Sequence, residues 1–215
     1  MKVLSILQPW ASLCVNTDSN GKALKQIETR SWNTKYRGKL LIHASKKKIR
    51  LQDGMYDLID HLGKTGFIEL FPDLPYGSVI GMVELTNTFR TENIDSSADL
   101  YQQSMLVDSD CNKFEGNIAT ISPSEYAFGD FSDGRFGWLF KNPILFKEPI
   151  PCKGQLSIWN LPKELEPEVN KQILLASPQL ECNNCEWTGN LDSAKSDEGA
   201  MYCPQCGSFN LYQNY

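Results

Sequence analysis

The sequence predicts an α+β protein, in which a small and mostly antiparallel β-barrel with decorating helices precedes a short cysteine-rich β module. Several short strand-like runs, separated by turn residues, accompany only two or three helix-like segments, as in small antiparallel barrels. Two CxxC pairs then lie close together near the C-terminus. The 215 residues are enough for one full-sized core and one small satellite.

The N-terminal part combines strands with helices. Residues 3–6 have the apolar character of a short strand, and Pro9 begins a helix because proline is well tolerated at a first helical position. Residues 39–44 form a second predicted strand. Ser45 is a typical N-cap, and the apolar residues that follow it keep helical spacing, which predicts a helix over 46–62.

Strands dominate the rest of the barrel domain. Residues 77–85 form a long predicted strand, whose glycines indicate a bend or a close backbone approach. Residues 90–133 are polar and rich in Ser, Asp and Asn, which predicts an irregular insertion. Strand character returns at 136–150 and 154–159.

These elements divide the chain into three parts. A barrel domain is expected at 1–162, with 90–133 as its insertion. A helix with its apolar residues on one face is expected in the linker at 163–177, and the cysteine-rich module occupies 178–215.

The cysteine-rich module has the spacing of a metal site. Its pairs are Cys182-x-x-Cys185 and Cys203-x-x-Cys206, with 17 residues between them. Each CxxC turn aims two thiolates at one point, and zinc prefers four soft ligands in a tetrahedron. The sequence therefore predicts a zinc ribbon that holds one structural Zn²⁺. Two disulfides, or thiol–disulfide redox chemistry, are the alternatives.

Charge is distributed unevenly along the chain. The net charge of −5 argues against a non-specific nucleic-acid binder. The first 50 residues, however, hold eleven Lys and Arg against two acidic residues, a local charge of +9, so that the rest carries −14. This asymmetry indicates one basic face that receives an anion. For the run of three lysines at 46–48, the alternative is a solvated start of the predicted helix.

The remaining cysteines indicate the compartment. Cys14, Cys111 and Cys152 have no evident partners in the sequence, which suits a reducing environment, and we expect a cytoplasmic protein. No apolar stretch approaches the roughly 18 residues that a membrane helix needs. Pro9 interrupts the N-terminal apolar run, which argues against a signal peptide.

Unusual side chains concentrate in the first fifty residues. In an extended segment, Glu28 and Arg30 share one face. Arginines can hold phosphate with two hydrogen bonds, and indole or phenol rings can stack on bases. The alternative is that the Glu, Arg and Lys side chains form a structural cluster, with the tryptophans in the core. For His43 the alternative is a structural role. The candidate nucleic-acid-binding residues are Gln8, Trp10, Lys25, Glu28, Arg30, Ser31, Trp32, Arg37, His43 and Lys46.

Three motifs in this region resemble the ASCH domain, a PUA-like β-barrel superfamily associated with RNA. They are Ser-Ile-x-Gln-Pro-Trp-Ala at 5–11, Lys-x-Ile-Glu-Thr-Arg-Ser-Trp at 25–32 and Tyr-Arg-Gly-x-Leu-x-Ile-His-Ala-Ser at 36–45. Later segments that begin at Gly77, Phe136 and Gly154 also fit, so the resemblance covers about residues 1–162. It implies a cleft between barrel and helices that binds RNA or a modified nucleobase.

The resemblance also implies an enzymatic alternative. One branch of the family resembles an amidohydrolase that deacetylates N4-acetylcytidine with a lysine, a threonine and a distant glutamate. The lysine falls on Lys25 and the glutamate on Glu84, but Glu28 stands where the threonine would be. A carboxylate is no simple substitute for a hydroxyl nucleophile. Lys25 with Glu28 or Glu84 could still serve as an acid–base pair, and other members resemble ribonucleases.

Three functions are therefore carried forward. The leading hypothesis is a nucleic-acid-binding protein, with RNA as the expected partner, that uses a basic cleft of the barrel and a structural zinc ribbon. The second is a hydrolase of a modified nucleoside or of RNA. The third is an adaptor that docks through the ribbon. Lys195 is the one cation from Gln179 onward, so a protein contact or a purely structural role fits the ribbon better than contact with nucleic acid.

Overall fold

The computed structural model describes residues 1–48, 73–93, 104–108, 119–176, 179–190, 194–197 and 200–214. Most of the helix predicted over 46–62 lies outside these residues, as does Cys111. The chain forms two compact units, Met1–Glu166 and Pro167–Tyr215.

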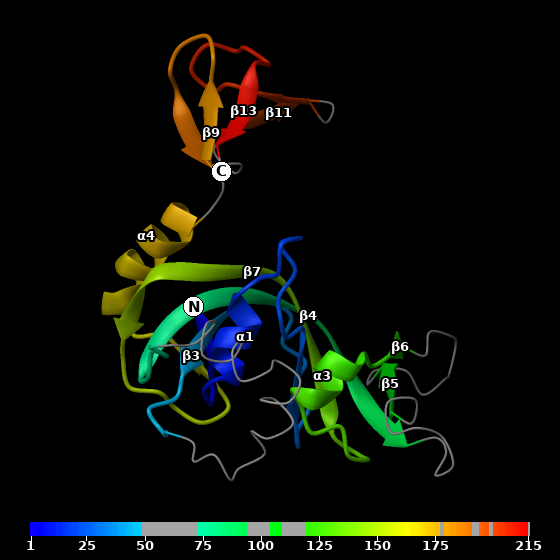
Figure 1. Ribbon diagram of the computed structural model, residues 1–215. Coiled ribbons are helices and arrows are strands. Elements are labelled where there is room, and N and C mark those ends of the chain that lie inside the picture. The colour runs from blue at the N-terminus through cyan, green and yellow to red at the C-terminus, as the bar shows by residue number, and fades with distance from the viewer. Residues whose placement is uncertain are drawn as a thin grey trace. The chain divides into compact units, whose positions relative to one another are not determined.

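One mostly antiparallel sheet, strongly curved in β4 and β7, forms the body of the first unit (Figure 1). Its strands follow the order β2 (Ile27–Arg30), β7 (Phe136–Pro151), β4 (Ser78–Asn93), β3 (Gly38–Ala44), β1 (Lys2–Ile6) and β8 (Ile158–Asn160). Two further strands extend it, β5 (Ser104–Asp108) on β4 and β6 (Ala119–Thr120) on β5. β1 and β3 are parallel, whereas the other pairs are antiparallel. The predicted fold class is confirmed.

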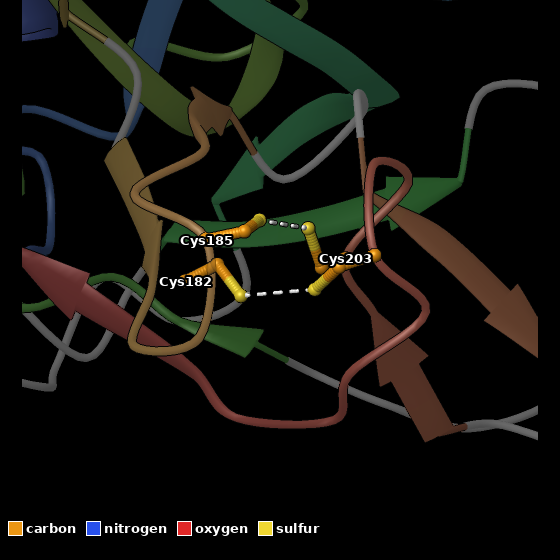
Figure 2. Close-up of side chains that lie close together, drawn as sticks. Cys182, Cys185 and Cys203 are labelled. Carbon is orange, nitrogen blue, oxygen red and sulfur yellow. Dashed lines mark hydrogen bonds between the residues drawn. The ribbon is translucent and has the colours of Figure 1, made fainter.

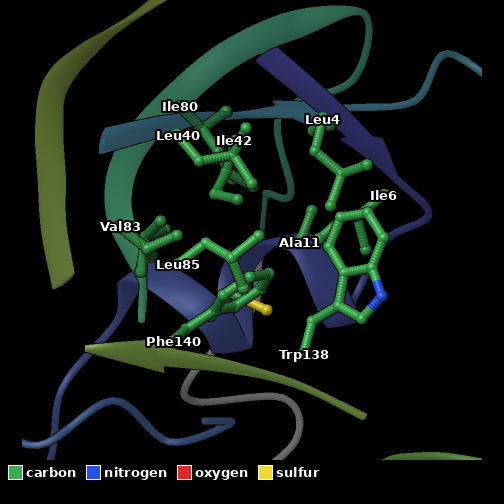
Figure 3. Packing of buried hydrophobic residues seen from close by; sticks show 13 residues of the cluster. Leu4, Ile6, Ala11, Leu40, Ile42, Ile80, Val83, Leu85, Trp138 and Phe140 are labelled. Atoms are coloured by element: carbon green, nitrogen blue, oxygen red, sulfur yellow. The ribbon is translucent and has the colours of Figure 1, made fainter. Parts of the chain in front are cut away.

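A short helix closes the core of this sheet. Helix α1 (Trp10–Val15) has only six residues, too few to be stable alone, so its stability comes from packing. Its inner side chains meet the buried residues of the sheet, as Figure 3 shows. Burial raises the pKa of the Cys14 thiol, which makes it an inert core residue. The core cluster is Leu4, Ile6, Ala11, Cys14, Val15, Leu40, Ile42, Ala44, Ile80, Val83, Leu85, Trp138 and Phe140.

The described parts of residues 90–133 are more regular than the sequence predicted. Strand β4 continues to Asn93, where its last residues pair with β5, and helix α3 (Pro123–Ala127) follows β6. Ser122 caps that helix by accepting a hydrogen bond from the Glu125 amide at 3.2 Å. The regularity comes from pairing of β5 with the end of β4 and with β6, which the polar composition of the segment does not reveal.

At Gly81 the backbone of β4 closely approaches the backbone of β7, as the glycines in this strand predicted. A Cβ at this position would lie 2.3 Å from the Ile144 carbonyl oxygen and 2.8 Å from Val15 Cγ1. Because the oxygen belongs to backbone, the clash cannot be relieved by a rotamer change. We expect Gly81→Ala to lower the free energy of unfolding of the first unit by about 2 kcal/mol, measured by urea denaturation. An unchanged urea midpoint would show that β4 and β7 can move apart to accommodate the new Cβ without a loss of stability.

The second unit contains helix α4 (Glu166–Ala176, which begins at the last residue of the first unit) and two small sheets. A one-turn 3₁₀ helix, Lys163–Leu165, precedes α4. One sheet has the order β10 (Thr188–Asn190), β9 (Gln179–Cys182), β13 (Leu211–Asn214), and the other pairs β11 (Lys195–Asp197) with β12 (Ala200–Tyr202). The short strands confirm the predicted β ribbon. Among the described helices, none has the length and hydropathy to cross a membrane.

Candidate functional site

A cavity of about 1470 Å³ opens in the first unit. Segments far apart in sequence line it. β1 and β3 are neighbours in the sheet, and β2, at the far end of the strand order, reaches them through the hydrogen bond from Arg30 to the Ser5 backbone oxygen. The lining comes from residues 5–7, 10, 28–30, 43, 45–46, 76–77, 126–132 and 151–157.

Polar side chains gather on one side of the cavity, around Ser5. Ser5 is opposite His43 in the parallel β1–β3 pair, and its backbone oxygen accepts a hydrogen bond from the Arg30 guanidinium at 2.9 Å. Trp159 Nε1 donates to Ser5 Oγ at 3.2 Å and the Trp159 ring meets the His43 ring edge-on, with centroids 5.7 Å apart. Gly154 lies against both Ser5 and His43. We call Ser5, Arg30, His43 and Gly154 the polar floor.

Aromatic side chains form another part of the lining. Tyr126 and Phe131 stack with ring centroids 5.9 Å apart and an interplanar angle of 16°. Phe128 and Phe131 are buried, whereas the other members are half-buried. The aromatic wall comprises Trp10, Tyr76, Tyr126, Phe128 and Phe131.

Charged residues are distributed unequally around the lining. Lys46 and Lys153 are exposed and form no ion pair within the described residues. The two lining carboxylates are neutralised by arginines, Glu28 by Arg30 at 3.1 Å and Asp130 by Arg135 at 3.2 Å. The rim is therefore left with a net positive charge that can attract an anion.

Lys25 belongs to a buried charge cluster behind the cavity. Its side chain is fully buried, its ammonium donates to the Ile27 carbonyl, and it lies 3.5 Å from the Glu28 carboxylate. Glu125 of α3 accepts hydrogen bonds from the Gln26 and Ile27 amides. Burial raises the pKa of the Glu125 carboxyl, which Lys25 partly offsets. The cluster ties α3, which carries part of the aromatic wall, to the start of β2.

Five of the ten predicted nucleic-acid-binding residues line the cavity, namely Trp10, Glu28, Arg30, His43 and Lys46. The others lie elsewhere. Lys25 is in the cluster just described, and Ser31 is exposed outside the lining.

Three more of these residues have partners in the structure that anchor them. The Gln8 amide bonds Ser12 and the Pro75 carbonyl. Trp32 packs edge-on against Trp138, and Arg37 bonds Thr88 and two carbonyls of its own loop.

Of the three candidate catalytic residues, Lys25 and Glu28 lie together at 3.5 Å, whereas Glu84 stands apart from them. Glu84 Oε2 accepts from Asn142 at 2.7 Å on the outer part of β4, opposite Lys39 and Lys141 in the sheet register. It does not line the cavity, and neither does Lys25.

Sequence reasoning missed two stretches of the lining. Residues 126–132 fell in the segment predicted as an irregular insertion, although its capping residue Ser122 and the spaced aromatics after it were a usable signal. Residues 154–157 were predicted as strand and 151–153 were left between two strands, although Pro151 and Gly154 mark a loop there.

In the second unit the four predicted cysteines converge. Their sulfurs all lie within 4.8 Å of one another, and Figure 2 shows Cys182 and Cys185 reaching from one loop toward Cys203 on the other. The Cys182–Cys206 and Cys185–Cys203 sulfur pairs are each 3.6 Å apart, too far for disulfides, whose sulfurs are about 2.05 Å apart. The cluster has the donor set and spacing of a metal site.

The two CxxC turns have the same backbone design. Cys182 and Cys203 each donate their amide to a carbonyl five residues on, at 2.9 and 2.7 Å. The residue after the second cysteine of each pair has a left-handed backbone, with φ of 58° at Glu186 and 73° at Gly207. This repeated geometry is what turns both thiols of each pair toward one point.

Comparison with known proteins identifies the first unit. The sequence matches the ASCH domain family over residues 4–127, more than half of the chain. The chain belongs to the ASCH domain family. The ASCH match includes most of the polar floor and of the aromatic wall, whereas Phe128, Phe131 and the segment 151–157 lie beyond it.

Two related proteins have the same name. Activating signal cointegrator 1 from Homo sapiens is 28% identical over 176 residues, which is 80% of this chain and 24% of that protein. The Mus musculus protein of the same name has the same identity and coverage. This ASCH chain therefore spans about a quarter of the length of the curated relatives it matches.

Proposed function

We propose that this ASCH protein binds single-stranded nucleic acid, with RNA as the expected partner, and holds a base in the cavity of its first unit. The supporting observation is a cavity of about 1470 Å³ that combines an aromatic wall with a cationic rim. Aromatic faces stack on bases of any identity, and cations neutralise the phosphates between them. The volume accommodates a nucleotide, since ligand pockets of about 300–1,000 Å³ enclose drug-sized molecules.

The two halves of the lining have different tasks in this proposal. Lys46 and Lys153 are exposed at the rim, where they can pair with phosphates without a large desolvation cost. Trp10, Tyr76 and Tyr126 are half-buried, so part of each side chain stays accessible to a base that enters the cavity. Glu28 and Asp130 add little repulsion because arginines neutralise both.

The rim lysines give the proposal a measurable salt dependence. We expect affinity for a short single-stranded RNA to fall as salt rises, with a log–log slope of about −0.7 for each neutralised phosphate. The double variant Lys46→Ala/Lys153→Ala should flatten that slope by about 1.4 and weaken binding at low salt by about tenfold. Fluorescence anisotropy across a salt series measures both quantities.

The matched control is Lys39→Ala/Lys141→Ala. These lysines are equally exposed but lie on β3 and β7 outside the cavity lining. The control should keep the wild-type slope. Equal losses in both double variants would mean that net charge attracts RNA, and the cavity proposal would then fail.

We also propose that the four cysteines hold one structural Zn²⁺. Four sulfurs about 2.3 Å from a tetrahedral metal lie about 3.8 Å apart, close to the 3.6 Å of the two cross-loop pairs. All six described cysteines are free of disulfides, which favours a reducing compartment such as the cytoplasm. The ribbon's shortage of cations favours a protein partner for its surface, as the sequence predicted.

A further inference from the structure

Two polar atoms of the floor have no hydrogen-bond partner although they are buried, Arg30 Nε and His43 Nδ1. Buried donors and acceptors are nearly always satisfied, so each exception calls for a physical explanation. Both residues line the cavity. The His43 side chain is buried, with 1% of the residue exposed, and it therefore cannot satisfy Nδ1 with bulk water.

The hydrogen bonds around His43 determine what Nδ1 can do. His43 Nε2 lies 3.2 Å from the carbonyl oxygen of Cys152. A carbonyl only accepts, so Nε2 carries the ring hydrogen. Burial lowers the pKa of His43, and the ring is neutral at neutral pH. Nδ1 is then a lone-pair acceptor, whereas Arg30 Nε is always a donor.

Gly154 covers the Nδ1 edge of the imidazole in a way that only glycine permits. A Cβ there would lie 2.4 Å from His43 Cε1, 2.8 Å from Nδ1 and 3.1 Å from Ser5 Oγ. Gly154 belongs to the loop 152–157 between β7 and β8. At the tip of that loop the Leu156 side chain is 93% exposed, so it adds no buried packing that would hold the loop in place. A ligand in the cavity reaches Nδ1 when the loop shifts away from the imidazole.

We propose that the polar floor recognises the lactam edge of a nucleobase, in which a ring N–H stands beside a carbonyl. Arg30 Nε–H donates to the carbonyl oxygen, and His43 Nδ1 accepts from the ring N–H. Uracil and guanine have this edge, whereas cytosine and adenine have a ring nitrogen without hydrogen there. The inference rests on the proposed function, and it adds a preference for uracil or guanine in the cavity.

The test changes the ligand, so it does not depend on any variant folding. Binding of the full-length protein is measured by calorimetry with short oligomers of uridine, 3-methyluridine and 5-methyluridine. The 3-methyl group removes the ring N–H, and the 5-methyl group adds equal bulk away from that edge. We expect the 3-methyl oligomer to bind about tenfold more weakly than oligouridylate and the 5-methyl oligomer within about twofold of it.

Two variants at His43 separate its two nitrogens. The amide of an asparagine reaches the position of Nδ1, and that of a glutamine the position of Nε2. We expect His43→Gln to bind oligouridylate about tenfold more weakly and to discriminate poorly against the 3-methyl oligomer, whereas His43→Asn keeps most of the discrimination. A purely structural histidine would lower the affinity for all three oligomers by the same factor.

The outcomes distinguish this inference from the proposed function. If all three oligomers bind alike and with the same salt dependence, the lactam preference is wrong and the nucleic-acid function stands. If oligocytidylate binds as tightly as oligouridylate, the preference is also overturned. If none of the oligomers binds, the proposed function itself fails.

Discussion

Replacing Lys25 with alanine is expected to destabilise the first unit by about 3 kcal/mol, since removing one partner from a buried charge cluster leaves the others uncompensated. Lys25 is fully buried between the Ile27 carbonyl and the Glu28 carboxylate. Without the ammonium, Glu28 keeps its ion pair with Arg30 and Glu125 keeps its two backbone amide donors, but both lose the buried positive charge of Lys25. Urea unfolding of the full-length protein, followed by tryptophan fluorescence, measures the loss.

The matched control is Lys22→Ala. Lys22 is three residues away from Lys25 and exposed. Surface charges contribute about 0–1 kcal/mol, so the urea midpoint of Lys22→Ala should barely differ from that of the wild type. Lys25→Met should recover the packing of the side-chain stem but not the charge pairing, and should fall between wild type and Lys25→Ala. A Lys25→Ala protein with wild-type stability that had lost hydrolysis of N4-acetylcytidine would instead favour the catalytic hypothesis.

The Lys25 cluster also shows what the sequence could and could not predict about the site. The cluster of Lys25, Glu28 and Arg30 was one of two interpretations of this segment, and its ion pairs are present in the structure. Glu28 and Arg30 share a face of β2, and Lys25 reaches Glu28 from just before the strand. Their depth was not readable, since it depends on Glu125, whose carboxylate contacts a backbone amide 98 residues away in sequence. A local pattern gives neighbours along the chain, whereas burial depends on what folds over them.

The same difference between local patterns and long-range contacts explains why the strands were predicted and part of the cavity lining was not. Apolar runs such as those of β1 and β3 report burial directly, so the sequence placed both strands within a residue or two. The aromatic wall is assembled from Trp10, Tyr76 and residues within and just after α3, which no periodicity connects. The CxxC turns are the opposite case, because each pair carries its own geometry in four residues and only the joining of the pairs is long-range.

Removing the metal is expected to unfold the ribbon while the first unit remains folded. Structural zinc contributes about 10–16 kcal/mol in small zinc domains, more than their apolar cores can supply. The described ribbon strands have only three or four residues each. We expect one zinc per chain by atomic absorption, and loss of ribbon amide dispersion in NMR spectra after chelation or in Cys203→Ser.

The control for that experiment is Cys152→Ser, which removes a thiol from the first unit and not from the metal cluster. It should keep both the zinc and the ribbon spectrum. A zinc-free protein with an unchanged ribbon spectrum would contradict the structural role. We expect metal removal to unfold only the ribbon because the two units differ in apolar burial. The first unit buries a core cluster of thirteen residues. In the described ribbon strands and CxxC turns, the buried apolar residues are Leu180, Cys182 and Cys203. Two of those three are among the four proposed metal ligands, so without metal little apolar burial would remain to offset the entropy of ordering the loops.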